Sequence, residues 1–121
     1  MIIPDTVTSV DEYTFSGWQS LEAVVIPDSV STIGWSAFYS CKNLKNVVLP
    51  NSLVSIKSSA FSKCDSLTNI YYGGTISDWS IITIDSYNET LEAALCYYCE
   101  VQPTDTTYQY WHYVDGVPTK W

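Results

Sequence analysis

Residues 3–71 consist of three consecutive copies of one 23-residue phrase, which align without a gap. The copies read IPDTVTSVDEYTFSGWQSLEAVV, IPDSVSTIGWSAFYSCKNLKNVV and LPNSLVSIKSSAFSKCDSLTNIY. Each copy has proline at its second position, phenylalanine at its thirteenth and leucine at its nineteenth. A tandem repeat of this length is typical of a solenoid, in which each coil packs mainly against its neighbours.

Each copy is expected to end in a short strand. Leu44, Val47 and Leu49 have the spacing L-x-x-L-x-L, and the last part alternates with the period of two that a strand requires. Proline follows and ends the strand, since it cannot donate a backbone hydrogen bond. The Ala-Phe segments at 36–39 and 58–62 are predicted to form single helical turns on the convex side. Successive strands would then stack into a narrow parallel sheet.

The middle coil carries the residues that recur along such a repeat: Ile26, Pro27, Ser29, Val30, Ile33, Gly34, Ala37, Phe38, Cys41, Leu44 and Val47. This pattern resembles the leucine-rich repeats of the BspA-like bacterial surface antigens, over residues 2–72. The first coil departs from it, with Asp11, Thr14 and Trp18 in place of glycine, alanine and cysteine. The resemblance implies a β-rich leucine-rich repeat solenoid with short helical turns, on or outside a bacterial cell, and an adhesive role rather than an enzymatic one.

The phrase breaks at Gly73-Gly74. The following residues, to about 101, are expected to form an irregular capping coil, because the end of a solenoid must cover its apolar cross-section. Alternation at Leu91, Ala93, Leu95 and Tyr97 predicts a final strand there. We therefore expect two parts: a capped solenoid over 1–101, and a linker with an aromatic hairpin over 102–121. The hairpin is predicted from Asp115-Gly116, which suits a tight turn.

No matching cap precedes the first coil, so Ile2 and Ile3 are expected to be exposed and to favour self-association. The chain begins within a repeat and has no signal peptide, which suggests that it is part of a longer protein.

The charge balance disfavours two classes of partner. The formal net charge is −8, and the only five basic residues are scattered lysines. Nucleic acid and anionic membrane surfaces both require clustered Lys or Arg. No apolar run is long enough to span a bilayer.

The cysteines do not favour an enzyme. Cys41 and Cys64 lie one repeat apart, at a spacing that a disulfide could bridge, although buried packing thiols are the favoured interpretation. Cys96 and Cys99 form C-Y-Y-C, but His112 is the single histidine and a strand would place these two cysteines on opposite faces. A thiol enzyme remains a minor alternative. We expect no catalytic residue, no metal and no cofactor, and His112 to pack within the hairpin.

The outward face of the predicted sheet is the first candidate binding surface. Val25, Val48 and Tyr71 would form an apolar row on it, flanked by Asn46 and Asn69. Exposed apolar surface often marks a binding site, and solenoids commonly bind proteins on such a face. A protein or extracellular-matrix ligand is therefore expected here.

The hairpin is the second candidate. Its residues Tyr110 to Gly116, with Thr119 and Trp121, are similar to the aromatic hairpin repeats of choline- or glucan-binding wall modules. That resemblance implies glycan or cell-wall attachment through Trp111, Tyr113 and Trp121, since aromatic faces stack on sugars or hold ammonium groups. Two other interpretations stay open: the tail covers the solenoid end, and the whole chain is a structural spacer.

Overall fold

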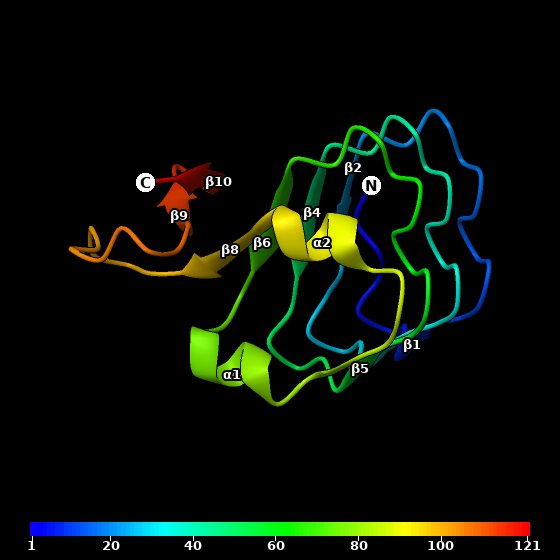
Figure 1. The fold of residues 1–121 in the computed structure, drawn as a ribbon, viewed down its shortest axis with the longest axis horizontal. Coiled ribbons are helices and arrows are strands. Elements are labelled where there is room, and N and C mark those ends of the chain that lie inside the picture. Colours follow the sequence, from blue (N-terminus) through cyan, green and yellow to red (C-terminus); the bar gives the residue numbers. More distant parts are fainter.

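The computed structural model describes residues 1–121 and shows a short stack of coils, lying side by side, that ends in a hairpin (Figure 1). Most of its regular structure is β-strand. The elements in chain order are β1 (Ser9–Val10), β2 (Ala23–Val25), β3 (Thr32–Ile33), β4 (Asn46–Leu49), β5 (Ser55–Ile56), β6 (Asn69–Tyr72), α1 (Ile76–Ser80), β7 (Thr83–Ile84), α2 (Glu89–Ala93), β8 (Leu95–Tyr98), β9 (Tyr110–Val114) and β10 (Val117–Lys120).

The coils stack through two sheets. One has the strand order β1-β3-β5-β7, and the other has the order β10-β9-β8-β6-β4-β2. Within the coils all pairs are parallel and in register at the repeat spacing, as in Val24 opposite Val47 and Val47 opposite Ile70. The predicted parallel sheet, and with it the leucine-rich repeat solenoid, is therefore confirmed.

The repeated side chains form columns inside the stack. The rings of Phe15 and Phe38 stack with centroids 5.2 Å apart, and those of Phe38 and Phe61 with centroids 5.0 Å apart. The thiols of Cys41 and Cys64 are free and buried, and each donates to the carbonyl of the phenylalanine one coil earlier, at 3.1 Å. These contacts each join one coil to the next.

The Ala-Phe segments are not helical turns, so that prediction is wrong. They are hydrogen-bonded turns in which Ser36, Ser40, Ser59 and Lys63 adopt positive φ values between 52° and 63°. Alternate backbone N–H groups of these segments bond to the next coil, as Phe38 N does to Ala60 O at 2.8 Å, and the others bond within their own turn, as Tyr39 N does to Ser36 O at 3.1 Å. The solenoid therefore carries inter-coil hydrogen bonds on its convex side as well as in its sheets.

The capping coil contains the only two helices. Thr75 caps α1 in a reciprocal capping box with Asp78, which explains why a helix begins directly after Gly73-Gly74. The predicted strand from Leu91 is partly wrong, because Leu91 and Ala93 belong to α2 and the strand β8 begins at Leu95. A helical turn buries Leu91 against the open end of the last coil.

The side chain of Asn88, just before α2, forms hydrogen bonds with the backbone of the third coil. This side chain is buried; the amide donates to Lys57 O at 3.0 Å and to Asp85 O at 3.1 Å, and its oxygen accepts from Phe61 N at 3.3 Å. One side chain thus satisfies the backbone groups that a fourth repeated coil would have bonded.

The hairpin β9–β10 continues the larger sheet. Strand β9 pairs in parallel with β8, with Tyr98 opposite Trp111, and antiparallel with β10. The intervening segment of residues 99–109 leaves the stack and returns, as Figure 1 shows at the end of the molecule that carries the C-terminus. An isolated hairpin is marginally stable, and this one is stabilised by the sheet that it extends.

At the other end, Ile2 forms a bridge with Val25 and stays 76% exposed. Ile3 is buried, so its predicted exposure is wrong: its side chain joins the core column of the next coil. No helix in the structure has the length and apolar character needed to cross a membrane.

Candidate binding groove

The outward side chains of the larger sheet form one row across the coils. Val25 lies beside Val48, Val48 beside Tyr71, and Tyr71 beside Cys96. A second row holds Asn46 and Asn69, whose side chains are joined by a hydrogen bond of 2.7 Å. The predicted outward orientation of this face is therefore correct.

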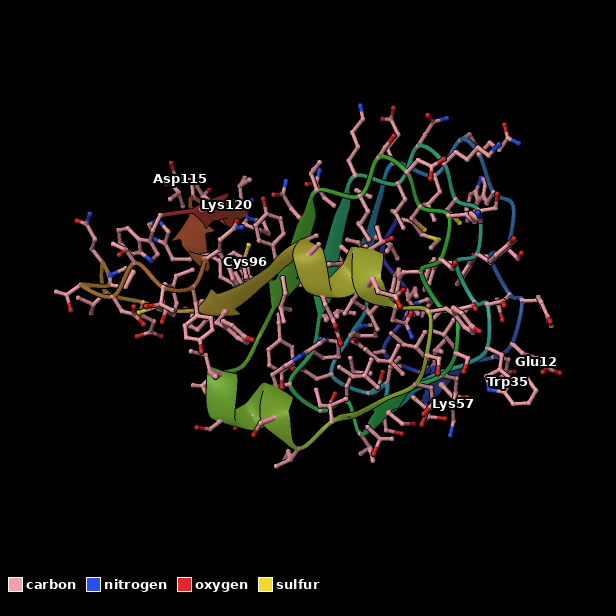
Figure 2. The ribbon with its side chains drawn as sticks, in the orientation of Figure 1. Glu12, Trp35, Lys57, Cys96, Asp115 and Lys120 are labelled. Carbon is pink, nitrogen blue, oxygen red and sulfur yellow. The ribbon has the colours of Figure 1, made fainter.

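Tyr71 is not an exposed binding residue, contrary to the expectation from the repeat. It is only 8% exposed, because the indole of Trp111 lies against it with ring centroids 5.3 Å apart. Trp111 is itself 1% exposed, and its Nε1 donates to Tyr72 O at 2.7 Å. Together with Cys96, these two rings form a small apolar cluster on the outer side of the sheet. Figure 2 shows Cys96 beneath the hairpin that carries Lys120 and Asp115.

The hairpin thereby makes a wall beside the exposed part of the strand face. Between them lies a groove of about 690 Å³. Its floor includes Val25 and Val48, and its wall includes Tyr98, Trp111 and Tyr113. The two candidate surfaces thus meet in one site, although the residues that meet are far apart in the sequence, as Val48 and Trp111 are.

The aromatic wall is rigid. The rings of Tyr98 and Trp111 meet edge to face at 5.1 Å, and those of Trp111 and Tyr113 at 5.0 Å. Tyr113 is 51% exposed and presents its ring at the groove, whereas Trp111 supports it from below. Partial desolvation and the nearby Glu100 carboxylate raise the pKa of Tyr98, whose hydroxyl donates to Glu100 at 3.4 Å.

Sequence reasoning missed several lining residues at the turn after each strand. Asp5, Asp28 and Asn51 occupy the same repeat position, directly after the proline, and all three line the groove. The period of the repeat could have revealed this column. Tyr98 was also missed, although its alternation with Cys96 along one strand places both on the same face.

Four of the predicted site residues do not line the groove: Tyr71, which Trp111 covers, and Asn46, Asn69 and Trp121. Asn46 and Asn69 lie at the opposite end of their strands. Trp121 stacks on His112 with ring centroids 3.6 Å apart, and its Nε1 donates to Cys99 O at 2.8 Å. His112 therefore packs within the hairpin, as expected.

The thiols are poorly placed for chemistry. Burial raises the pKa of Cys96, and the neighbouring thiol of Cys41 and burial raise that of Cys64, which favours the unreactive thiol form of both. The hydrogen bond with Cys64 lowers the pKa of Cys41, but the Cys41 side chain is fully buried in the core. Cys99 donates to Val101 O at 3.0 Å. No group of three or more His, Cys, Asp or Glu side chains is arranged to hold a metal ion.

The stacked parallel coils define the class of this protein as a leucine-rich repeat solenoid. The family model of the BspA type leucine rich repeat region (6 copies) matches residues 1–100. The chain therefore belongs to the BspA-type leucine-rich repeat family, which confirms the resemblance seen in the repeats.

Two solved structures are similar to this chain. The leucine rich repeat protein of T. pallidum (TpLRR) matches with 25% identity and a TM-score of 0.61, over 82% of this chain and 57% of that one. A leucine rich cell surface protein from Faecalibacterium prausnitzii A2-165 matches with 25% identity and a TM-score of 0.39, over 69% of this chain and 34% of that one. This chain thus spans little more than half the length of TpLRR. A comparison with curated proteins gave no match.

Proposed function

We propose that this chain is a non-enzymatic binding module of a bacterial cell-surface or secreted protein, and that it holds a protein or extracellular-matrix ligand in the groove between the strand face and the hairpin. The observation that carries the proposal is the convergence of Val25 and Val48 with Tyr98 and Tyr113 around one groove. Membership of the BspA-type family supports the same class of function.

The groove has the composition that protein interfaces favour. An apolar floor, the exposed Tyr113 and the half-buried Tyr98 resemble the core of an interface, where aromatic residues are enriched and carry much of the binding energy. The wall is held in place by the buried Trp111, so little order must be gained when a ligand binds. Its volume also lies within the roughly 300–1,000 Å³ that is usual for ligand sites.

Attachment to glycans or the cell wall through the hairpin alone is the second candidate. Tyr113 and Trp121 are both substantially exposed and could present aromatic surface to a sugar. Trp111 does not offer such a surface, because its ring is enclosed between Tyr71, Tyr98 and Tyr113. The hairpin alone therefore has fewer free aromatic faces than its sequence suggests.

Point variants test the groove better than deletion of the hairpin, because deletion would also uncover Tyr71. The intact chain, Val25→Asn and Tyr113→Ala would be measured by surface plasmon resonance against extracellular-matrix proteins, bacterial wall preparations and a glycan panel. Val54→Asn is the matched control, because Val54 is an exposed valine of the other side of the coil and does not line the groove.

We expect a matrix protein to bind, and each groove variant to weaken that binding at least tenfold, or about 1.4 kcal/mol, with no change for Val54→Asn. Binding of glycans alone, lost with Trp121→Ala and kept with Val25→Asn, would move the function to the hairpin. The absence of any ligand would contradict the proposal and favour the spacer interpretation.

A further inference from the structure

The groove carries acidic side chains and no basic ones, and its side-chain donors are neutral, such as the hydroxyls of Ser29 and Tyr113 and the amide of Asn51. Pro27 and Pro50 line it and have no N–H group, and the indole N–H of Trp111 is already bonded to Tyr72 O. None of the five lysines of the chain is among its lining residues. The groove therefore has negative charge and no positive charge of its own.

Two carboxylates stand along one edge of this groove. Asp5 and Asp28 are exposed and occupy equivalent positions in successive coils, and Asn51 continues their column. Neighbouring parallel chains lie about 4.8 Å apart, so the two charges are close enough to act on one cation. The apolar floor of Val25 and Val48 reduces the access of water on one side and strengthens that field.

The aromatic wall favours the same sign of charge. Tyr98 and Tyr113 line the groove, and the face of a tyrosine ring attracts ammonium and guanidinium groups. The net charge of −8 adds a long-range attraction for cationic partners. Carboxylates, ring faces and overall charge are three separate features that select a cation.

On this basis we propose that the groove binds a positively charged segment of a protein ligand, with a lysine or arginine side chain held by the carboxylates of Asp5 and Asp28 and the rings of Tyr98 and Tyr113. This inference rests on the proposed function and names the chemistry of its ligand. The groove crosses three coils and has a volume of about 690 Å³, which suits a peptide segment better than a single small ammonium ion.

The probes are four fluorescently labelled peptides of equal length in which serine alternates with lysine, arginine, glutamine or glutamate. Fluorescence anisotropy would measure their binding to the full chain at about 0.01 M and about 0.15 M salt, between which the Debye length falls from ~30 Å to ~8 Å. Asp5→Asn/Asp28→Asn is the test variant. Glu12→Gln/Asp65→Asn removes the same number of carboxylates outside the groove and is its control. Glu12 lies near Trp35 and Lys57, at the far end of the molecule from the hairpin (Figure 2).

We expect the lysine and arginine peptides to bind at least tenfold more tightly than the glutamine peptide, and the glutamate peptide not to bind. The test variant should lose at least tenfold in affinity at either salt concentration and the control less than twofold. Tyr113→Ala should also weaken binding, whereas Tyr87→Ala, which removes an exposed tyrosine outside the groove, should not. Circular dichroism checks that each variant is folded.

Equal losses in the test and control variants would show attraction by net charge alone and would overturn the inference. Equal binding of the glutamine and lysine peptides would overturn it too, as would displacement of the peptide by choline at the peptide's own concentration. The proposed function is judged separately. If Val25→Asn abolishes binding of a matrix protein and Asp5→Asn/Asp28→Asn does not, the groove binds protein and only the inferred charge preference fails.

Discussion

The repeated coils and the C-terminal region are stabilised in different ways. In the coils, each contact recurs one repeat further on, as in the stacked rings of Phe15, Phe38 and Phe61. Their parallel sheet register also keeps one spacing between coils. A coil therefore depends on its neighbours for every part of its core.

In residues 73–121 the strands β7 and β8 continue the two sheets, but several stabilising contacts have no counterpart in the repeated coils. Asn88 bonds the backbone of the third coil, Trp111 fixes the hairpin, and Thr75 and Asp78 cap α1. The difference implies that a destabilising substitution in one coil also weakens the neighbouring coils. A destabilising substitution in the C-terminal region should weaken only the structure around it. Four variants test this comparison.

Phe38→Ala should have the largest effect. Phe38 is fully buried between two other rings, and its loss leaves a cavity that both neighbouring coils must line. We expect the free energy of unfolding to fall by about 4 kcal/mol in urea titrations monitored by circular dichroism. The control Trp35→Ala, at an exposed position of the same coil, should change it by less than about 0.5 kcal/mol. A small effect of Phe38→Ala would show that the stack of rings does not couple the coils.

Trp111→Ala should be somewhat less harmful, at about 3 kcal/mol, and its effect should be local. It removes the ring that covers Tyr71 and the hydrogen bond to Tyr72 O. Hydrogen exchange should show faster exchange in β9 and β10 and unchanged protection in β2 and β4. Trp111→Phe keeps most of the apolar contact and should be milder. Loss of protection throughout the coils would contradict the local character of this region.

Asn88→Ala should cost about 2 kcal/mol, because it leaves the buried Phe61 N–H without a partner. Urea titration is again the measurement. Asn43→Ala is the control, since Asn43 makes a single exposed hydrogen bond, to Gln19 O. If both variants lowered the free energy of unfolding by the same amount, the backbone of the third coil would not need the Asn88 side chain as a hydrogen-bond partner.

Tyr72→Phe should have the smallest effect and should be stabilising, by about 1 kcal/mol at neutral pH. Tyr72 is in register with Leu49 inside the stack, and its buried hydroxyl has no hydrogen-bond partner. Burial, with Asp78 and Tyr97 nearby, raises the pKa of Tyr72 to about 12.

The same variant makes a prediction about pH. The folded state holds the Tyr72 proton more tightly than the unfolded state, whose pKa is about 10. The contribution of this tighter proton binding to the stability of the folded state is complete below about pH 10. It is lost as the pH rises towards 12. Tyr72→Phe should therefore show a shallower loss of stability across that range than the unaltered chain. An identical pH dependence would show that other groups dominate.

Much of the solenoid could be predicted because the residue pattern that specifies each coil is local and recurs in every repeat. The spacing of Leu44, Val47 and Leu49 indicated a strand, and its recurrence indicated the register of the sheet. The Ala-Phe segments were mistaken for helical turns because the sequence does not show that Ser36 and Ser59 adopt positive φ. That conformation costs a non-glycine residue energy, which hydrogen bonds between coils offset here.

The capping coil was harder to predict for the same reason. Leu91 and Ala93 fit the alternation of a strand, yet the open end of the last coil selects a helical turn there. Short apolar runs of this kind do not distinguish strand from helix. Asn88 gave no signal at all, because its role depends on backbone groups of Lys57 and Phe61, which are far away in the sequence.

The sequence by itself determined the coil, its period and the outward position of Val25, Val48 and Tyr71. Equivalent positions of successive repeats lie side by side, so the repeat length sets the register of the sheet. It also determined that the tail forms a hairpin, since Asp115-Gly116 suits a tight turn. Only the tertiary structure decided where that hairpin packs, and so which outward residues remain open to a ligand. Parallel pairing of β9 with β8 depends on burying Trp111 against Tyr71 and bonding it to Tyr72 O. Such contacts follow from shape and from unpaired backbone groups at the end of the stack, which no local pattern of residues encodes.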